Sequence, residues 1–235
     1  MSMAERVDNE AGFILHTRHY RETSLIVEIL SRNHGRLALV ARGARRPMSS
    51  IKSRLLGFQP LLLSWFGKGS LRTLHAAEWQ GGDLRLQGRA LMCGFYLNEL
   101  LLKLLPTDDP HERLYDRYAQ TLAALAGGNE AEPILRRFEL DLLSELGYAQ
   151  TLTHLIDGDE VRPERRYGYV FDRGVVVTEG GPGYAGKTLL DLATRDFSDP
   201  RTLAEGKLLM RALINHYLSD KPLLTRQLLI DLQQI

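Results

Sequence analysis

The sequence of 235 residues contains one cysteine, Cys93. A single cysteine excludes an internal disulfide and any zinc site built from cysteine ligands. Long hydrophobic runs are also missing, because the longest apolar stretches, such as Leu61-Leu62-Leu63, are far too short to span a bilayer. The N-terminus does not join a basic start to an apolar stretch, which argues against a signal peptide. We therefore expect a cytoplasmic protein.

Acidic residues are absent from one long segment. No Asp or Glu lies between Glu28 and Glu78, whereas nine Lys and Arg do. Residues 1–80 carry twelve Lys and Arg against six Asp and Glu, a net charge of +6, and residues 81–235 carry eighteen against twenty-three, a net charge of −5. The overall charge of +1 is therefore a cancellation. Such asymmetry indicates a polyanionic partner for the basic part.

Five short segments in the first eighty residues have the composition of β-strands. Turn signals separate them at Asn33-His34-Gly35 and Gly67-Lys68-Gly69. We predict strands at residues 12–15, 24–30, 36–42, 60–66 and 70–78. Five strands at this spacing favour a small barrel or sandwich, and a basic loop on a five-stranded barrel is typical of the OB-fold.

Beyond Gly81-Gly82 the hydrophobic period changes from two to that of an α-helix. The predicted fold class is α+β with two domains, an OB-fold barrel at 1–80 and a helical domain at 81–235 with a small irregular insertion around 148–186. That insertion contains one predicted β-hairpin, with strands at 167–171 and 175–178. Helices are predicted at residues 85–105, 110–126, 132–146, 187–193, 200–218 and 222–232.

Residues 42–54, which we call the basic loop, are the strongest functional signal that composition provides. They read Arg-Gly-Ala-Arg-Arg-Pro-Met-Ser-Ser-Ile-Lys-Ser-Arg. Guanidinium groups bind phosphate oxygens in pairs, lysine adds a point charge, and serine hydroxyls and loop N–H groups also donate to phosphate. We predict that the nucleic-acid site comprises Arg32, Arg36, Arg42, Arg45, Arg46, Lys52, Arg54 and Arg72.

Aromatic side chains near this loop are candidates for stacking on unpaired bases. They are Tyr20, Phe58, Trp65, Phe66 and Trp79. The alternative is a merely solvated cationic loop, with most of these aromatic side chains in the core of the barrel.

Residues Gly181–Thr188 match the phosphate-loop pattern G-x-x-x-x-G-K-[ST]. In such a loop Lys187 would contact phosphate and Thr188 would contact magnesium. However, the 47 residues that follow read as helices and contain no apolar strand ending in Asp. Pro182 also lacks an N–H group that could point at phosphate. We interpret the match as a glycine-rich turn before a helix.

Motifs of hydrolytic enzymes are missing. The sequence has no G-x-S-x-G, no H-E-x-x-H and no paired-carboxylate motif. Among its seven histidines, His16 and His19 at the end of a predicted strand have no carboxylate at ligand spacing, and His75 and Glu78 would lie on opposite faces of a strand. We therefore predict no catalysis, no metal and no cofactor.

Several sequence blocks, taken in order from about residue 12 to 230, resemble the RecO family of DNA repair and recombination mediators. The blocks are Gly-Phe-Ile-Leu-His-Thr-Arg-His-Tyr-Arg-Glu-Thr-Ser-Leu (12–25), His-Gly-Arg-Leu (34–37), Val-Ala-Arg-Gly-Ala-Arg-Arg (40–46), Leu-Gly-Phe-Gln-Pro (56–60), Tyr-Leu-Asn-Glu-Leu-Leu (96–101), Leu-Arg-Arg-Phe-Glu-Leu-Asp-Leu-Leu-Ser-Glu-Leu-Gly-Tyr (135–148) and His-Tyr-Leu-Ser-Asp-Lys-Pro-Leu-Leu-Thr-Arg-Gln-Leu (216–228).

The resemblance implies an N-terminal OB-fold and a helical C-terminal domain, without enzymatic activity. It implies binding of single- and double-stranded DNA, annealing of complementary strands, and loading of RecA, together with RecR, onto DNA covered by single-stranded DNA-binding protein (SSB). A nucleoid-associated cytoplasmic location follows. Many members carry a four-cysteine zinc site after the block ending at residue 148. Residues 149–186 contain no cysteine here, so this sequence resembles the zinc-free branch.

The resemblance also implies a site for the acidic, Phe-ended tail of SSB on the helical domain. Such a ligand needs an apolar pocket with a cationic rim. We predict that Arg136 and Phe138, with Lys207 or Arg211 from a later helix, form this site. The alternative is that either Arg136 or Arg137 pairs with Glu139, Asp141 or a neighbour and only solubilises this face of the helix.

Three other functions stay open. An OB-fold also serves RNA-binding modules of translation. A nucleotide-driven enzyme would use the glycine-rich turn at 181–188, and a pure scaffold would bind no nucleic acid at all.

Overall fold

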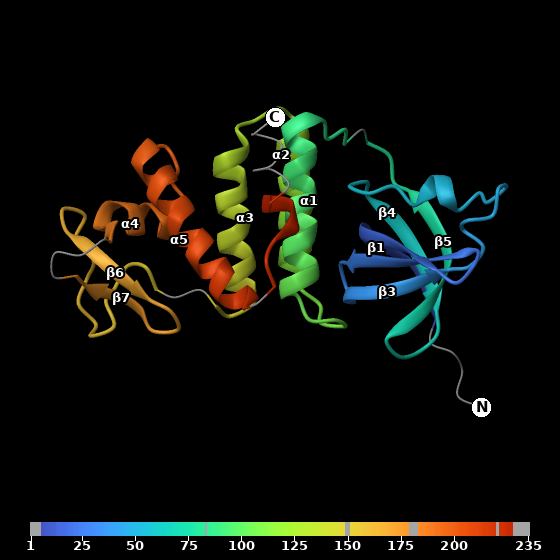
Figure 1. Ribbon diagram of the computed structural model, residues 1–235, viewed down its shortest axis with the longest axis horizontal. Coiled ribbons are helices and arrows are strands. Elements are labelled where there is room, and N and C mark those ends of the chain that lie inside the picture. Colours follow the sequence, from blue (N-terminus) through green and yellow to red (C-terminus); the bar gives the residue numbers. More distant parts are fainter. Residues whose placement is uncertain (1–5, 83, 149–150, 179–182, 220, 228–235) are drawn as a thin grey trace. The chain divides into compact units, whose positions relative to one another are not determined.

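The computed structural model describes residues 6–82, 84–148, 151–178, 183–219 and 221–227 (Figure 1). The chain forms two compact units. The first unit comprises Met1–Asn129 together with Leu223–Ile235, and the second comprises Glu130–Pro222. The first unit therefore combines the predicted β domain with two helices and with the end of the chain.

Five strands of the first unit form a closed barrel in the order β1-β2-β3-β5-β4. All neighbours are antiparallel except β3 and β5, which are parallel. This architecture confirms the predicted barrel. The strands are β1 (Arg6–Tyr20), β2 (Ser24–Ser31), β3 (Gly35–Ala41), β4 (Leu61–Phe66) and β5 (Leu71–Trp79).

The barrel interior is filled by alternate residues of its strands. Val27 and Ile29 of β2 lie beside Leu39 and Leu37 of the neighbouring strand β3, and all four side chains are buried in the core. Trp65 belongs to the same core and is 2% exposed. The suggestion that Trp65 stacks on bases is therefore wrong, because its ring is inaccessible.

The first strand is much longer than the predicted segment 12–15. Irregularities in its pairing fall between Val7 and Glu10 and between Ile14 and His16. Such bulges shift the alternation of buried and exposed residues. Residues 16–19 are all exposed, so this half of the strand carries no hydrophobic period by which the sequence could reveal it.

Two helices, α1 (Gly88–Leu104) and α2 (Glu112–Ala126), pack on the barrel within the first unit. Asn98 of α1 donates from its side-chain amide to the backbone oxygen of Leu15 at 2.8 Å. Phe13 contacts the rings of Tyr115 and Tyr118, with centroids 5.3 and 5.2 Å apart. These contacts cover the outer surface of β1 around residues 13–15.

The end of the chain returns to the first unit. The carboxylate of Glu99 on α1 accepts from the backbone N–H groups of Leu224 and Thr225 at 2.8 and 2.9 Å. Residues 224–227 are helical, and the rest of the predicted last helix lies outside the described residues.

The second unit combines three helices with a small sheet of order β7-β6-β8. Its hairpin turns at Asp172, as predicted. None of the described helices is both long and apolar enough to cross a membrane. The elements are α3 (Ala131–Glu145), β6 (Arg166–Val170), β7 (Gly174–Val177), β8 (Tyr184–Ala185), α4 (Gly186–Thr194) and α5 (Pro200–Leu218).

Candidate nucleic-acid interface

A groove of about 530 Å³ lies on the outer face of the barrel. The pairing register places its walls side by side, because Tyr20 lies opposite Ser24 and Val40 lies beside Thr73. Val40 points outward since its neighbours Leu39 and Ala41 point into the core. The lining residues are Tyr20, Arg21, Thr23, Ser24, Val40, Arg42, Gly43, Arg46, Leu71 and Thr73.

The groove is cationic. Arg42 and Arg46 are exposed at its edge, and neither forms an ion pair with any described residue. The guanidinium of Arg21 lies over the ring of Tyr20, 5.2 Å from its centroid. Three guanidinium groups without a carboxylate partner among the described residues therefore line the same groove as one aromatic ring.

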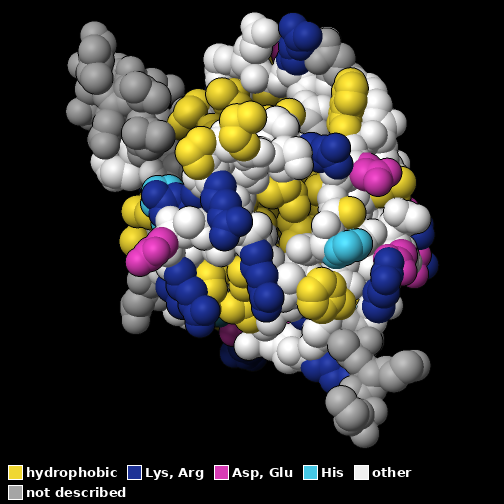
Figure 2. All heavy atoms as spheres, turned by 90° about the vertical axis from the view of Figure 1, so that its right-hand side faces the viewer, with side chains coloured by type: hydrophobic (Ala, Val, Ile, Leu, Met, Phe, Trp, Pro, Cys, Tyr) yellow, Lys and Arg dark blue, Asp and Glu magenta, His cyan; other side chains and the backbone are white. Residues whose placement is uncertain are grey.

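The basic loop is attached to the turn between β1 and β2 by Arg45. Its guanidinium donates to the backbone oxygen of Glu22 at 3.0 Å, and its backbone N–H donates to the oxygen of Thr23 at 2.9 Å. Lys52 and Arg54 lie farther along the loop, in a short 3-10 helix (Lys52–Arg54), where both are exposed. Figure 2 shows Lys and Arg side chains spread over this end of the first unit, with hydrophobic side chains between them.

Three of the predicted cations lie elsewhere and are already paired. Arg32 forms ion pairs with Glu112 at 3.0 Å and Asp116 at 3.2 Å. The hydrogen bond to Asp116 raises the pKa of Arg32. Arg72 contacts Asp108 at 2.5 Å.

Arg36 is the third. It pairs with Glu28 at 3.4 Å and donates to the backbone oxygen of Leu105 at 3.0 Å. Like Arg32 and Arg72, it holds the barrel to the segment that contains α1 and α2. A cation neutralised by a carboxylate attracts phosphate weakly, so we leave these three out of the proposed site.

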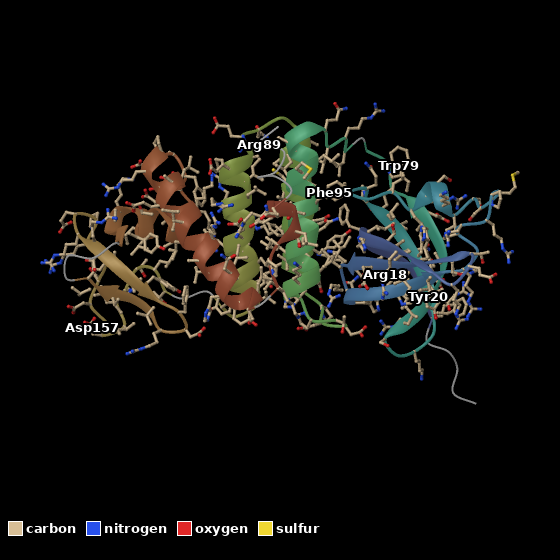
Figure 3. The ribbon with its side chains drawn as sticks, in the orientation of Figure 1. Arg18, Tyr20, Trp79, Arg89, Phe95 and Asp157 are labelled. Atoms are coloured by element: carbon tan, nitrogen blue, oxygen red, sulfur yellow. The ribbon has the colours of Figure 1, made fainter. Side chains whose placement is uncertain are left out.

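The predicted site did not include Arg21, which lines the groove, or Arg18, which is exposed on β1 two residues before Tyr20. Both follow the apolar part of β1, in a stretch interpreted as lying beyond the strand. Arg18 and Tyr20 are two residues apart on an extended strand and share one face, and Figure 3 shows them together on the barrel, apart from Trp79. In the sequence, the spacing of Arg18 and Tyr20, two residues apart, could have indicated that they share this face.

The other aromatic candidates do not line the groove. Phe58 is 7% exposed and packs edge-on against Phe95, so it is unsuited to stacking on a base. Phe66 is 38% exposed and lies beside His75. Trp79 is 60% exposed but ends β5, whereas the groove uses the start of that strand.

The predicted tail site in the second unit has a different arrangement. Arg136 is buried, and its guanidinium contacts the fully buried carboxylate of Glu139 at 2.6 Å. Phe138 is 1% exposed. Neither side chain is accessible to a peptide, and the alternative of an ion pair with Glu139 is the arrangement observed.

Lys207 and Arg211 of α5 are exposed. Lys207 pairs with Glu132 at 2.9 Å. Arg211 has no ion-pair partner in the part of the chain that the structure describes. Leu208, between them in sequence, is 59% exposed.

The glycine-rich turn is also informative, although Gly181 and Pro182 lie outside the described residues. Lys187 contacts Asp191 at 2.5 Å and Asp199 at 3.2 Å. The buried hydroxyl of Thr188 donates to Glu205 at 3.0 Å. Both side chains that would bind phosphate and magnesium therefore bind carboxylates.

A metal site is not evident in the described parts of the chain, where no group of three or more His, Cys, Asp and Glu comes together. Cys93 is buried in α1.

Comparisons with known proteins cover nearly the whole chain. Residues 3–82 match the family described as recombination protein O N terminal, and residues 85–227 match recombination protein O C terminal. The DNA repair protein RecO of Thiobacillus denitrificans is 55% identical, over 100% of this chain and 96% of the relative. The RecO proteins of Nitrosospira multiformis and Aromatoleum aromaticum are each 51% identical, over 98% and 100% of both chains respectively.

Proposed function

The chain belongs to the RecO family of DNA repair and recombination proteins, and on that premise we propose that its barrel binds the backbone of single- and double-stranded DNA. RecO proteins are recombination mediators and not enzymes. The alignments cover 96% and 100% of the length of two of these relatives, so the comparison concerns nearly their whole length.

The observation that carries this proposal is the set of cations without carboxylate partners around the groove. Arg21, Arg42 and Arg46 line it, and Lys52 and Arg54 extend the basic surface along the loop. Guanidinium groups and phosphates form bidentate, charge-assisted hydrogen bonds. Binding of this kind releases counterions and is therefore weakened by salt.

Annealing follows from the same electrostatics. Two complementary strands repel each other through their phosphates, and a shared cationic surface offsets that repulsion. We propose that the protein anneals strands in this way, acts with RecR, and helps to load RecA on DNA covered by SSB. These partners imply a cytoplasmic, nucleoid-associated location.

We further propose that the acidic, Phe-ended tail of SSB contacts α5. Leu208 offers an exposed apolar side chain between Lys207 and Arg211, and Arg211 is the cation free to receive a carboxylate. A labelled tail peptide should bind Arg211→Ala more weakly than the wild type. Arg201→Ala is the matched control, because Arg201 of the same helix pairs with Glu205 at 3.2 Å. Equal affinity of the wild type and Arg211→Ala would remove α5 from the tail site.

Strand annealing at two salt concentrations, with and without SSB, tests the main proposal. We expect salt-sensitive annealing by the wild type and much slower annealing by the double variant Arg42→Glu/Arg46→Glu. A competition between matched DNA and RNA separates DNA repair from an RNA-binding role in translation. The proposal would be refuted if DNA binding changed neither with salt concentration nor in the double variant, or if the protein strongly preferred RNA.

A further inference from the structure

The turn between β1 and β2 contains a strained arginine. Arg21 has a φ of 50°, in the left-handed region that side chains other than glycine and asparagine rarely adopt. Glycine would satisfy this turn at lower conformational cost. Strained residues of this kind persist where the side chain has a use and the surroundings enforce the conformation.

The surroundings of Arg21 do enforce it. Arg45 donates to the backbone oxygens of Arg21 and Glu22, at 3.5 and 3.0 Å, and its own N–H bonds to Thr23. Arg45 of the basic loop thus stabilises the conformation of the turn. The guanidinium of Arg21 lies over one face of the Tyr20 ring, so that a cation and an aromatic ring are in contact in the groove.

The rest of the lining suits a base better than a phosphate. Val40 and Leu71 supply apolar surface, and Thr23, Ser24 and Thr73 supply hydroxyl groups that can donate or accept hydrogen bonds. Phosphate needs neither an aromatic ring nor apolar surface. A base suits this lining, because its flat faces pack against an aromatic ring and apolar side chains, whereas its polar edge forms hydrogen bonds with hydroxyl groups.

We propose that the groove holds an unstacked base of a single strand against the ring of Tyr20, on the face that Arg21 does not cover, with Arg21 placed to contact the neighbouring phosphate. This inference rests on the proposed DNA binding and deepens it. The bases of a duplex are stacked on one another and cannot enter the groove. Duplex DNA would therefore use only the outer cations of the basic loop, and Tyr20 determines the preference for single strands.

Affinities for three probes test the inference: oligo(dT), an abasic strand of the same length, and a duplex. Stacking contributes a factor of roughly 5 to 150 per base. We expect the wild type to bind oligo(dT) at least about fivefold more tightly than the abasic strand. Tyr20→Ala should lower the ratio of oligo(dT) to duplex affinity by a similar factor, and Tyr20→Phe should restore it.

Arg21→Gly separates binding from folding. Because glycine relieves the strained turn, the melting temperature should not fall, whereas affinity for oligo(dT) should. Arg195→Gly is the control for DNA affinity only: Arg195 also has a positive φ, of 57°, but it lies in the second unit, where it pairs with Asp141 at 3.2 Å. Trp79→Ala controls for the loss of an exposed aromatic ring on the same barrel.

Equal affinity of the wild type for oligo(dT) and the abasic strand would overturn the inference, as would an unchanged ratio in Tyr20→Ala. Those results would leave the proposed function intact if binding stayed salt-dependent. Absence of salt-dependent binding to any of the three probes would instead refute the proposed function.

Discussion

Replacing Arg42 and Arg46 together by alanine should flatten the salt dependence of DNA binding. Both side chains are exposed at the groove, and neither has an ion-pair partner among the described residues. Their loss should hardly affect folding, because exposed substitutions of this kind usually change stability by less than about 0.5 kcal/mol.

The magnitude follows from counterion release. Each phosphate contact contributes about −0.7 to the slope of log affinity against log salt on a single strand. Two lost contacts should therefore reduce the slope by about 1.4. Between 50 and 200 mM salt this amounts to a factor of about 7, so the defect of the variant should be about sevenfold larger at 50 mM than at 200 mM.

Fluorescence anisotropy with a labelled single strand at four or more salt concentrations would measure both slopes. Arg42→Lys/Arg46→Lys keeps the charge and should keep the slope. Arg89→Ala/Arg113→Ala removes the same charge from exposed positions of α1 and α2 and should leave the slope close to that of the wild type. A slope of the groove variant equal to that of the wild type would refute the assignment of the two arginines to phosphate.

Three further outcomes follow from contacts outside the groove. Arg136→Ala removes the guanidinium that contacts the buried carboxylate of Glu139 at 2.6 Å and should cost about 3–5 kcal/mol in urea unfolding. A cost below about 1 kcal/mol would show that the pair contributes little. Burial alone would raise the pKa of Glu99, but hydrogen bonds, first that from Lys103, hold this pKa below its usual value. The Glu99 carboxylate therefore stabilises the fold above the pKa of an unfolded Glu, and this stabilisation is lost as the pH falls through the folded pKa. Melting from pH 7 to 3 should therefore show a shallower acid decline for Glu99→Gln than for the wild type. ATP should bind neither the wild type nor Lys187→Ala, and micromolar binding lost in the variant would restore the phosphate-loop interpretation.

Hydrophobic periodicity predicted most of the fold. The strands β2 to β5 begin and end within one residue of their predicted positions, and α5 matches its predicted range. The exception is β1, of which only the apolar centre was found. The end of this strand, from His16 to Tyr20, begins with four polar residues in a row. It therefore lacks the alternation of hydrophobic and polar residues by which a strand is predicted.

Charge composition did not distinguish free from paired cations. It drew attention to Arg42 and Arg46, which line the groove, but it counted Arg32 and Arg72 equally. The partners of these two, Asp116 and Asp108, lie 84 and 36 residues away in sequence. Pairing over such distances depends on how the helices pack on the barrel, which no local pattern encodes.

The net charge of residues 1–80 therefore overstates the cationic surface of the folded chain. Carboxylates of the more acidic half neutralise part of it, since Asp116 pairs with Arg32 and Asp108 pairs with Arg72 within one compact unit. A fragment that ended with the barrel would separate these cations from their partners. Such a fragment should bind DNA with a steeper salt slope than the full chain, by up to about 0.9 for each uncovered arginine that contacts a duplex. An equal slope for fragment and full chain would contradict the idea that these ion pairs mask two arginines that would otherwise contact phosphate.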